Sequence, residues 1–409
     1  MDLRSSSPRA VRWPPGEEPV PGAPHVVLAD RAARGEFAAL QAALHRLGVP
    51  TVRLDAAHAA APPAGPSAAP SAAPTAAPTA GPDDGPPGPL DLTLFLDGGL
   101  VTIDGRRFRP SVVWARGPMP RAIPATPGTA GPPFHAGSGA AGPPFRAGSG
   151  SAGPPFRAGS GAAGPLFRAD SWSALVDQLA AIAPVRLPGR GAGRLAQLAG
   201  AAAAGVRTPR TIVTTDPGTA AADLPEGRLV VKVLDEHFVE IAPGRMVGLF
   251  PEITDRETLL RRPPPGFPVI VQEHVEHDLE LRVYYLAGDL HAFAVTKPSP
   301  DAPWRDPAAV SVRATPVPPR AAEVVRRLAR DWELAFGAFD LLLAAGDVVF
   351  LEVNADGDWR WFEARAGTRA VTNAAASMVR TLHLNVLRES APPPVGGVLD
   401  FLLLGTEAL

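Results

Sequence analysis

Short apolar runs and longer stretches with an apolar residue every three to four positions alternate along this sequence. The short runs predict β-strands, and the longer stretches predict amphipathic helices. Predicted strands cover residues 25–30, 49–55, 111–117, 211–216, 229–235, 246–250, 268–275, 280–288 and 290–296, and 91–108 predicts a hairpin. Predicted helices cover residues 36–47, 171–183, 190–204, 254–262, 318–336 and 368–382. This mixture predicts an α/β or α+β protein.

Pro-rich and Gly-rich segments divide the pattern into parts. Residues 1–24 are Pro-rich with few large apolar side chains, so we expect them to be disordered. Residues 25–120 begin with strand, helix and strand, typical of an open α/β domain. A Pro/Ala linker at 56–89 interrupts this domain and has no means of burying a core.

A second interruption, residues 121–170, contains an internal repeat. The copies GPPFHAGSGAA, GPPFRAGSGSA and GPPFRAGSGAA begin at Gly131, Gly142 and Gly153, with a period of 11 residues and a decayed fourth copy. One Phe per repeat cannot build a packed core, so we expect a flexible insertion. A tether that binds through its Phe and Arg residues is the alternative.

The most informative stretch is 339–359, FDLLLAAGDVVFLEVNADGDW. It predicts two strands, 339–344 and 348–353, joined by a turn at 345–347, because β-branched and Leu residues flank a central glycine. Such a hairpin brings residues near its two ends side by side.

Three oxygen-bearing side chains lie on this hairpin. Glu352 and Asn354 share one face because side chains alternate along a strand. A loop with an odd number of residues places Asp340 opposite Glu352, whereas an even loop would place it on the other face. With the odd loop, two carboxylates and an amide converge, which suits magnesium. The alternative is a hairpin with polar residues facing solvent, but the apolar neighbours favour a partly buried site, where charge needs a partner.

Composition narrows the function classes. The chain of 409 residues has a net charge of −2, no cysteine, 50 Pro and 41 Gly. We therefore expect no nucleic-acid or anionic-membrane binding, and no thiol chemistry. No apolar run is long enough to span a membrane, and the N-terminus lacks the apolar core of a signal peptide, so a cytoplasmic location is expected.

Only two of the 39 basic residues are lysines, Lys232 and Lys297. Lys232 lies within an apolar strand, where its ammonium needs water or a fixed anion such as a nucleotide phosphate. The alternative is a lysine on an edge strand that reaches solvent. Glu280 and Arg282 share a strand face, where an Arg can bind a phosphoryl group through two hydrogen bonds. A surface Glu–Arg pair is the common alternative.

The order of these parts resembles the ATP-grasp ligases. A Lys-bearing strand precedes a strand end at 272–275, then an acid-x-Arg strand, and finally an Asp strand followed by Glu-x-Asn. The stretch FLEVN-x-x-G-x-W is similar to the graspetide (microviridin-type) peptide maturases of that superfamily, and the RimK-type glutamate ligases are close relatives. The resemblance covers residues 185–384, and the N-terminal part with VVWARG resembles a pre-ATP-grasp domain.

The resemblance implies an ATP-grasp fold with two subdomains, 171–271 and 272–409, and a set of site residues. Lys232 matches the lysine on α- and β-phosphate oxygens, and Gln272, Glu273 and Val275 match the adenine hinge. Glu280 matches the position near the ribose, and Arg282 matches the arginine that steadies the transferring phosphate. The implied magnesium ligands are Asp340, Glu352 and Asn354.

Two parts of the match are looser. The maturases commonly have Asn-Lys-Leu where this chain has Gly193-Arg194-Leu195, so Arg194 keeps the positive charge with a different geometry. Lys297 and Arg313 lie where a cation facing the substrate or the γ-phosphate is expected.

The implied cofactors are ATP and Mg²⁺, and the implied activity is a ligase that forms an acyl-phosphate and then an amide or ester. The substrate would be a precursor peptide or another carboxylate, and dimers are frequent among such ligases. One alternative is a RimK-type enzyme that adds amino acids. Another is a nucleotide- or peptide-binding protein without turnover, which the Arg194 departure motivates.

Overall fold

The computed structural model describes residues 11–14, 21–30, 36–55, 92–95, 99–116, 164–189, 193–234, 238–242, 245–248, 251–298, 309–355 and 357–390. The Pro/Ala linker 56–89 and the three full repeats lie outside these ranges. Residues 11–14 and 21–24, where disorder was expected, include ordered backbone: β1 (Val11–Arg12) pairs with the third strand, and the second strand begins at Pro24.

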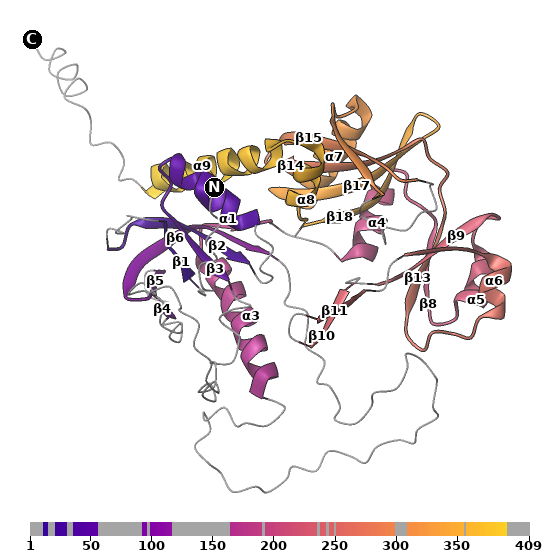
Figure 1. Ribbon diagram of the computed structural model, residues 1–409, viewed down its shortest axis with the longest axis horizontal. Coiled ribbons are helices and arrows are strands. Elements are labelled where there is room, and N and C mark those ends of the chain that lie inside the picture. The colour runs from indigo at the N-terminus through magenta and orange to yellow at the C-terminus, as the bar shows by residue number, and fades with distance from the viewer. Residues whose placement is uncertain are drawn as a thin grey trace, which may run out of the picture.

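The N-terminal unit is built on one mixed sheet with strand order β1-β3-β2-β6-β5-β4, and β7 pairs with β6 (Figure 1). Its strands β2, β3, β6 and β7 are parallel, as a βαβ start predicts. The bounds are β2 (Pro24–Asp30), β3 (Thr51–Asp55), β4 (Leu92–Phe95), β5 (Leu100–Ile103), β6 (Arg106–Arg116) and β7 (Val185–Leu187). Helices α1 (Glu36–Arg46) and α9 (Ala370–Ser390) pack on one face, and α3 (Gly164–Ile182) packs on the other.

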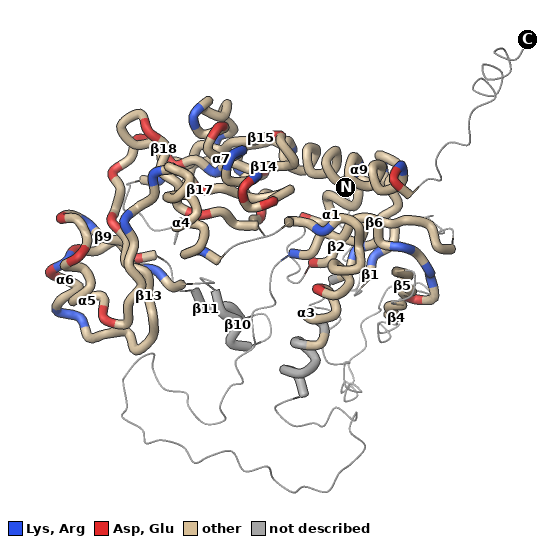
Figure 2. The backbone as a smooth tube through the Cα atoms, turned by 180° about the vertical axis from the view of Figure 1, so that it is seen from behind, with Lys and Arg blue, Asp and Glu red and all other residues tan. Residues whose placement is uncertain are grey.

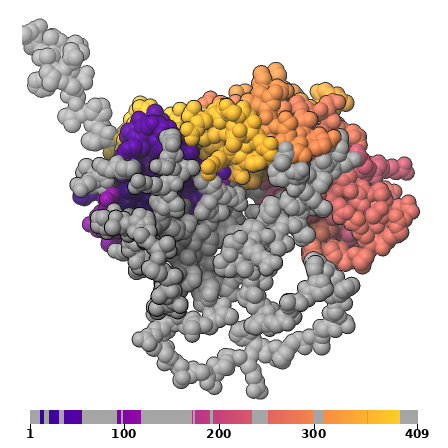
Figure 3. Space-filling view, in the orientation of Figure 1, coloured from indigo at the N-terminus to yellow at the C-terminus, as the bar shows by residue number. Residues whose placement is uncertain are grey.

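A smaller lobe follows in the sequence and protrudes from the rest of the molecule (Figure 3). Its antiparallel sheet has the order β12-β9-β13-β8 and packs against α5 and α6 through a small apolar core. The bounds are β8 (Thr211–Thr214), α5 (Pro217–Ala220), β9 (Arg228–Val233), β12 (Glu252–Asp255), α6 (Arg256–Arg261) and β13 (Val269–Glu273). A separate pair, β10 (Phe238–Ala242) and β11 (Arg245–Gly248), lies between β9 and β12 in sequence.

The C-terminal unit is a five-stranded antiparallel sheet, β16-β15-β14-β17-β18. Its bounds are β14 (Leu279–Leu286), β15 (Asp289–Thr296), β16 (Ser311–Thr315), β17 (Phe336–Ala344) and β18 (Asp347–Asn354). Helices α4 (Arg194–Ala203) and α7 (Pro319–Asp331) cover one face. The other face packs partly against α8 (Arg360–Ala366), α9 and the N-terminal unit.

The C-terminal helix α9 joins the two larger units. The space-filling view shows its region directly against the N-terminal unit (Figure 3). Trp114 of β6 is fully buried and contacts three other aromatic rings, Phe37, Phe336 and Trp359, at centroid distances of 5.4, 4.9 and 5.7 Å. Because these rings come from both units, one apolar core spans the boundary.

Several predicted boundaries were wrong. The helix predicted from Ser171 begins at Gly164, inside the decayed repeat, and the helix predicted to reach Phe336 ends at Asp331. Glu333 follows in the left-handed region (φ 52°), which turns the chain into β17. Strands β7, β10, β12 and β16 and helices α5 and α8 were not predicted.

The charge distribution agrees with the net charge near zero. Basic and acidic positions are interspersed along the described elements (Figure 2). Among the described helices, none is long and apolar enough to cross a membrane.

Trp114→Ala should lower the free energy of unfolding by about 3–5 kcal/mol, because it leaves a large cavity between the two units. Urea denaturation monitored by circular dichroism measures this loss. Phe267→Ala, at a ring that is 36% exposed, should change the unfolding free energy by no more than about 0.5 kcal/mol. Equal effects of the two substitutions would contradict a shared core.

Candidate functional site

The hairpin of β17 and β18 has the predicted pairing of Asp340 with Glu352, but its loop and its strands differ from the prediction. Its loop has two residues, Ala345 and Gly346, both at positive φ (52° and 81°), so the loop is even rather than odd. A β-bulge then shifts the register between Asp340 and Leu341, so that Asp340 pairs with Glu352. The extra residue offsets the even loop. The expected loop length was wrong, and the expected pairing of the two carboxylates is present.

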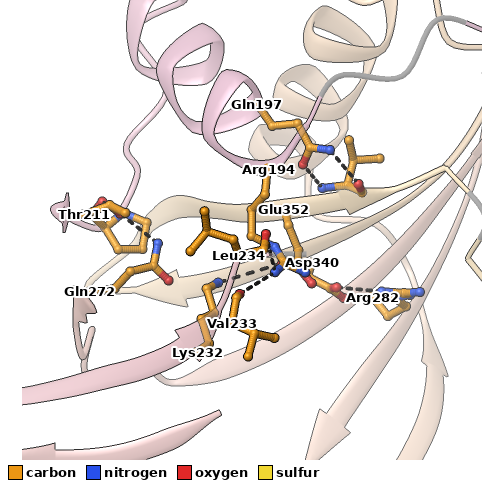
Figure 4. Close-up of polar contacts among 12 residues, drawn as sticks. Arg194, Gln197, Thr211, Lys232, Val233, Leu234, Gln272, Arg282, Asp340 and Glu352 are labelled. Atoms are coloured by element: carbon orange, nitrogen blue, oxygen red, sulfur yellow. Dashed lines mark hydrogen bonds and ion pairs between the residues drawn. The ribbon is translucent and has the colours of Figure 1, made fainter. Parts of the chain in front are cut away.

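Glu352 is held by two cations from other parts of the chain (Figure 4). Nε of Arg194 lies 2.7 Å from Oε2 of Glu352, and Nζ of Lys232 lies 3.8 Å from the same atom. Arg194 also donates from Nη1 to the carbonyl oxygens of Val233 and Leu234, at 3.0 and 3.2 Å. The first turn of α4, the end of β9 and the strand β18 therefore meet at one carboxylate.

Lys232 lies on an inner strand of its sheet, so the edge-strand alternative does not describe it. Its neighbours Leu229 and Val231 pack toward the core beneath α5 and α6, and Lys232 points to the opposite face. Its side chain is 9% exposed. Burial lowers the pKa of Lys232, and the Glu352 carboxylate opposes this shift.

Asp340 is paired with Arg282 of the adjacent strand β14. Nη1 of Arg282 donates to Oδ2 of Asp340 at 2.6 Å, and the guanidinium lies over Phe362 at 5.4 Å from the ring centroid. Burial raises the pKa of Asp340, Arg282 opposes that shift, and the charge of Glu352 adds to it. Burial alone would lower the pKa of Arg282, but the interactions with Asp340 and Tyr284 together outweigh burial and raise that pKa.

The predicted hinge lies at the end of β13. Gln272 is buried and donates from Nε2 to Oγ1 of Thr211 at 2.7 Å, so its side chain is used within the lobe. The amide of Glu273 donates to the carbonyl of Arg210. Val275 packs with Leu342, Ala344 and Val349 beneath the Asp340 face of the hairpin. The predicted hinge therefore connects the lobe to the C-terminal sheet.

Glu280 has two basic partners. Nζ of Lys297 lies 2.5 Å from Oε1 of Glu280, and Nε2 of His277 lies 3.2 Å from it. Burial would raise the pKa of Glu280, but the hydrogen bonds with His277 and Lys297 outweigh burial and lower it. The bond to Glu280 raises the pKa of His277. His277 was not predicted, since a single histidine beside a strand carries no spacing signal.

Two predicted residues lie apart from these pairs. Arg313 is exposed on the edge strand β16 and is in register with Ala294 and Leu281. That register places it on the face of α7, opposite to Arg282. Asn354 is exposed at the end of β18 and is in register with Ala338.

Gln197 of α4 was missed by the sequence analysis and fixes the strand that carries Glu352. Its side chain accepts from the amide of Val353 at 2.9 Å and donates to the carbonyl of the same residue at 3.0 Å. Both groups are buried. Gln197 follows Arg194 by three residues on one helix, but this spacing does not reveal a hydrogen-bond partner 156 residues away.

The donor set suits a hard divalent cation. Asp340 and Glu352 are paired across two strands, and their mutual repulsion contributes to the raised pKa of Asp340. A cation between them would relieve that repulsion, and carboxylate and amide oxygens are ligands that Mg²⁺ accepts. Among the described residues no group of three or more His, Asp or Glu side chains could hold a metal ion, so a site here needs the Asn354 amide or ligand oxygens.

Comparison with solved structures supplies the fold. The ATP-grasp ligase PsnB complexed with minimal precursor is similar over 88% of this chain and 99% of its own, with a TM-score of 0.57 and 15% identity. Macrocyclase MdnC from Microcystis aeruginosa MRC, bound with precursor peptide MdnA, is similar over 87% of this chain and 99% of its own, with a TM-score of 0.55 and 16% identity. Macrocyclase MdnB from the same organism gives the same coverage, a TM-score of 0.51 and 19% identity.

No model of a known protein family and no curated protein matches this sequence. The solved structures show that the chain has the ATP-grasp fold of these ligases, which confirms the predicted fold class.

Gln197→Leu should lower the free energy of unfolding by about 1–3 kcal/mol, because it leaves the buried amide and carbonyl of Val353 without partners. Thermal and urea unfolding measure the change. Gln178→Leu, at an exposed position of α3, serves as the control and should stay within about 0.5 kcal/mol of the parent protein. If both substitutions behave alike, the double hydrogen bond does not hold β18.

Proposed function

We propose that this protein is an ATP-dependent ligase that activates a carboxylate as an acyl-phosphate and joins it to an amine or hydroxyl. We further propose a ribosomal precursor peptide as substrate, joined to itself by an amide or ester bond. A RimK-type enzyme that adds amino acids is the alternative within the same chemistry.

One observation supports this proposal most directly. Two carboxylates on adjacent strands, Asp340 and Glu352, lie opposite each other, and a buried lysine from a different sheet reaches one of them. Buried charge of this density is costly unless it serves to bind a charged ligand or a metal. The precursor peptides, ADP and Mg named with the similar ligases fit such a site.

Each group of site residues has a separate role in this proposal. Asp340, Glu352 and Asn354 would hold Mg²⁺, which when bound neutralises phosphate charge. Lys232 and Arg282 would place positive charge beside the phosphoryl group, where negative charge spreads during transfer. Gln272, Glu273 and Val275 would form the adenine hinge and Glu280 would lie near the ribose.

The reaction needs no nucleophile from the protein. An oxygen of the substrate carboxylate attacks the γ-phosphorus, ADP leaves, and an acyl-phosphate forms. An amine or hydroxyl then attacks the acyl carbon and phosphate leaves. Lys297 is proposed to face the substrate, and its ion pair with Glu280 would hold it in that position. Arg313 is left out of this step because its register places it on the opposite face of the sheet.

A second candidate is a nucleotide- or peptide-binding protein without turnover. Arg194 favours it, because its guanidinium pairs with Glu352 at 2.7 Å, a carboxylate that the ligase proposal assigns to Mg²⁺. Phosphate release separates the two candidates. Release of phosphate from ATP with Mg²⁺ and a peptide encoded beside this gene supports the ligase, and nucleotide binding without release supports the binding protein.

Asp340→Asn and Glu352→Gln should each lower phosphate release about 100-fold or more, since charge stabilisation by a metal ion is worth several kcal/mol and each ~1.4 kcal/mol is tenfold. A coupled assay of phosphate from ATP and peptide measures the rate. Glu257→Gln, on an exposed pair of α6, is the matched control and should match the parent protein. Unchanged rates in the first two variants would exclude the proposed metal ligands.

A further inference from the structure

The ring of His277, in the connection between β13 and β14, lies between two oxygen acceptors. Its Nδ1 lies 2.8 Å from the carbonyl oxygen of Val275, and its Nε2 lies 3.2 Å from Oε1 of Glu280. A carbonyl oxygen only accepts hydrogen bonds, and so does an ionised carboxylate. A neutral imidazole has one N–H, whereas an imidazolium has two. Both contacts are therefore hydrogen bonds only when His277 carries a positive charge.

Glu280 is the ionised partner in this contact. Nζ of Lys297 lies 2.5 Å from Oε1 of Glu280, the same atom that His277 contacts. The side chains of His277, Lys297 and Glu280 are 10%, 11% and 16% exposed, so water and salt screen their charges only weakly. Two cations at one carboxylate favour its charged form. Glu280 therefore accepts a hydrogen bond from His277 and does not donate one.

The other charged groups beside His277 pair among themselves. The ring of His274 lies 6.2 Å from the ring of His277, and its Nδ1 lies 3.5 Å from Oε1 of Glu276. Nη2 of Arg228 donates to that same oxygen at 2.7 Å. Glu276 is 74% exposed, so its charge acts on His277 through solvent. The close charges that face His277 are thus Glu280 and Lys297.

The pKa of His277 agrees with this geometry. The hydrogen bond with Glu280 raises that pKa, burial and Lys297 oppose the shift, and the carbonyl of Val275 adds to it. An ordinary histidine has a pKa of about 6.5. Because the pKa is raised on folding, the contribution of this bond is fully present below about pH 6.5 and is lost as the pH rises through the raised pKa.

The second oxygen of Glu280 takes part in neither contact. His277 and Lys297 both contact Oε1, which leaves Oε2 to other donors. Glu280 is in register with Leu342, two positions from the pair of Arg282 with Asp340. Side chains two positions apart share a face of the sheet. An ionised oxygen therefore lies on the face that carries the proposed phosphate and metal residues, and it suits hydroxyl donors.

We propose that His277 is a positioning residue for nucleotide binding: as a cation it holds Oε1 of Glu280, so that Oε2 accepts from the ribose hydroxyls of ATP. This inference rests on the ligase function proposed above, which places Val275 at the adenine and Glu280 near the ribose. His277 bonds to both of these residues. One ring therefore fixes the separation between the two halves of the nucleoside site.

Proton loss from His277 would undo this arrangement. A neutral ring that keeps its bond to Val275 would direct the Nε2 lone pair at Oε1 of Glu280, and two acceptors do not form a hydrogen bond. Nucleotide affinity is therefore expected to be highest when His277 is protonated, and to fall as the pH rises through its raised pKa.

Nucleotide binding by two variants of the full chain tests this role. His277→Phe keeps a ring without either N–H, and His277→Lys keeps a charge, with an ordinary pKa of about 10.4. Calorimetry measures the Kd of ADP in excess Mg²⁺ from pH 6 to pH 9. At pH 6 we expect His277→Phe to bind about fivefold more weakly than the parent, the size of one net hydrogen bond. His277→Lys should stay within about twofold of the parent.

The pH profile and a modified nucleotide separate positioning from a structural role. At pH 9 the parent should bind ADP as weakly as His277→Phe, while His277→Lys retains its affinity. The nucleotide 2′,3′-dideoxyADP has no ribose hydroxyl, so the parent and both variants should bind it within about twofold of one another at every pH. His45→Phe, at an exposed position of α1, is the matched control and should follow the parent throughout.

Other outcomes would overturn the inference. Parental ADP binding by His277→Phe at pH 6 would show that the ring does not position Glu280. Equal weakening by Phe and Lys would show that charge is not what His277 supplies. Equal weakening toward ADP and 2′,3′-dideoxyADP would show a structural role. If the parent protein binds neither nucleotide, the ligase function itself fails and this inference with it.

Discussion

The carboxylate of Glu352 ties together three parts of the chain that are distant in sequence. Arg194 reaches it from the first turn of α4 and Lys232 from the end of β9, so that one cation belongs to a helix and the other to the sheet of the small lobe. Buried or half-buried charge is tolerated only with partners, and removing one partner of such a group is costly. The position of the small lobe over the C-terminal sheet therefore depends on a polar contact at the site itself.

The rest of the scaffold is apolar and crosses the boundary between units. Trp114, Phe336 and Trp359 come from the N-terminal sheet, the C-terminal sheet and the turn beyond β18, and they pack as one cluster. A buried hydrogen bond of 2.7 Å between Ser111 and His383 adds a polar link between β6 and α9. The two large units therefore share one apolar core, whereas the described residues of the lobe have a separate core of their own.

The sequence predicted the elements whose apolar pattern was strong, and missed several short strands at sheet edges. Strands β13, β14 and β15 are apolar, and most of their residues are buried. Edge strands β12 and β16 carry polar residues at alternate positions, since water can satisfy one side.

The same limit applies to the site. Spacing along one strand predicted that Glu280 and Arg282 share a face, and Glu352 and Asn354 likewise. Contacts between distant segments, such as Arg194 with Glu352 or Gln197 with Val353, depend on tertiary packing that no local pattern contains.

The β-bulge beside Asp340 has a consequence for how this hairpin can vary. The two-residue loop and the extra residue each shift the pairing by one position, and their shifts cancel at Asp340 and Glu352. A hairpin with three loop residues and no bulge would give the same pairing. The pairing thus depends on the total number of residues in the loop and the bulge. Losing or gaining a single residue in either one turns Glu352 away from Asp340. A residue moved from one to the other leaves the two carboxylates facing each other.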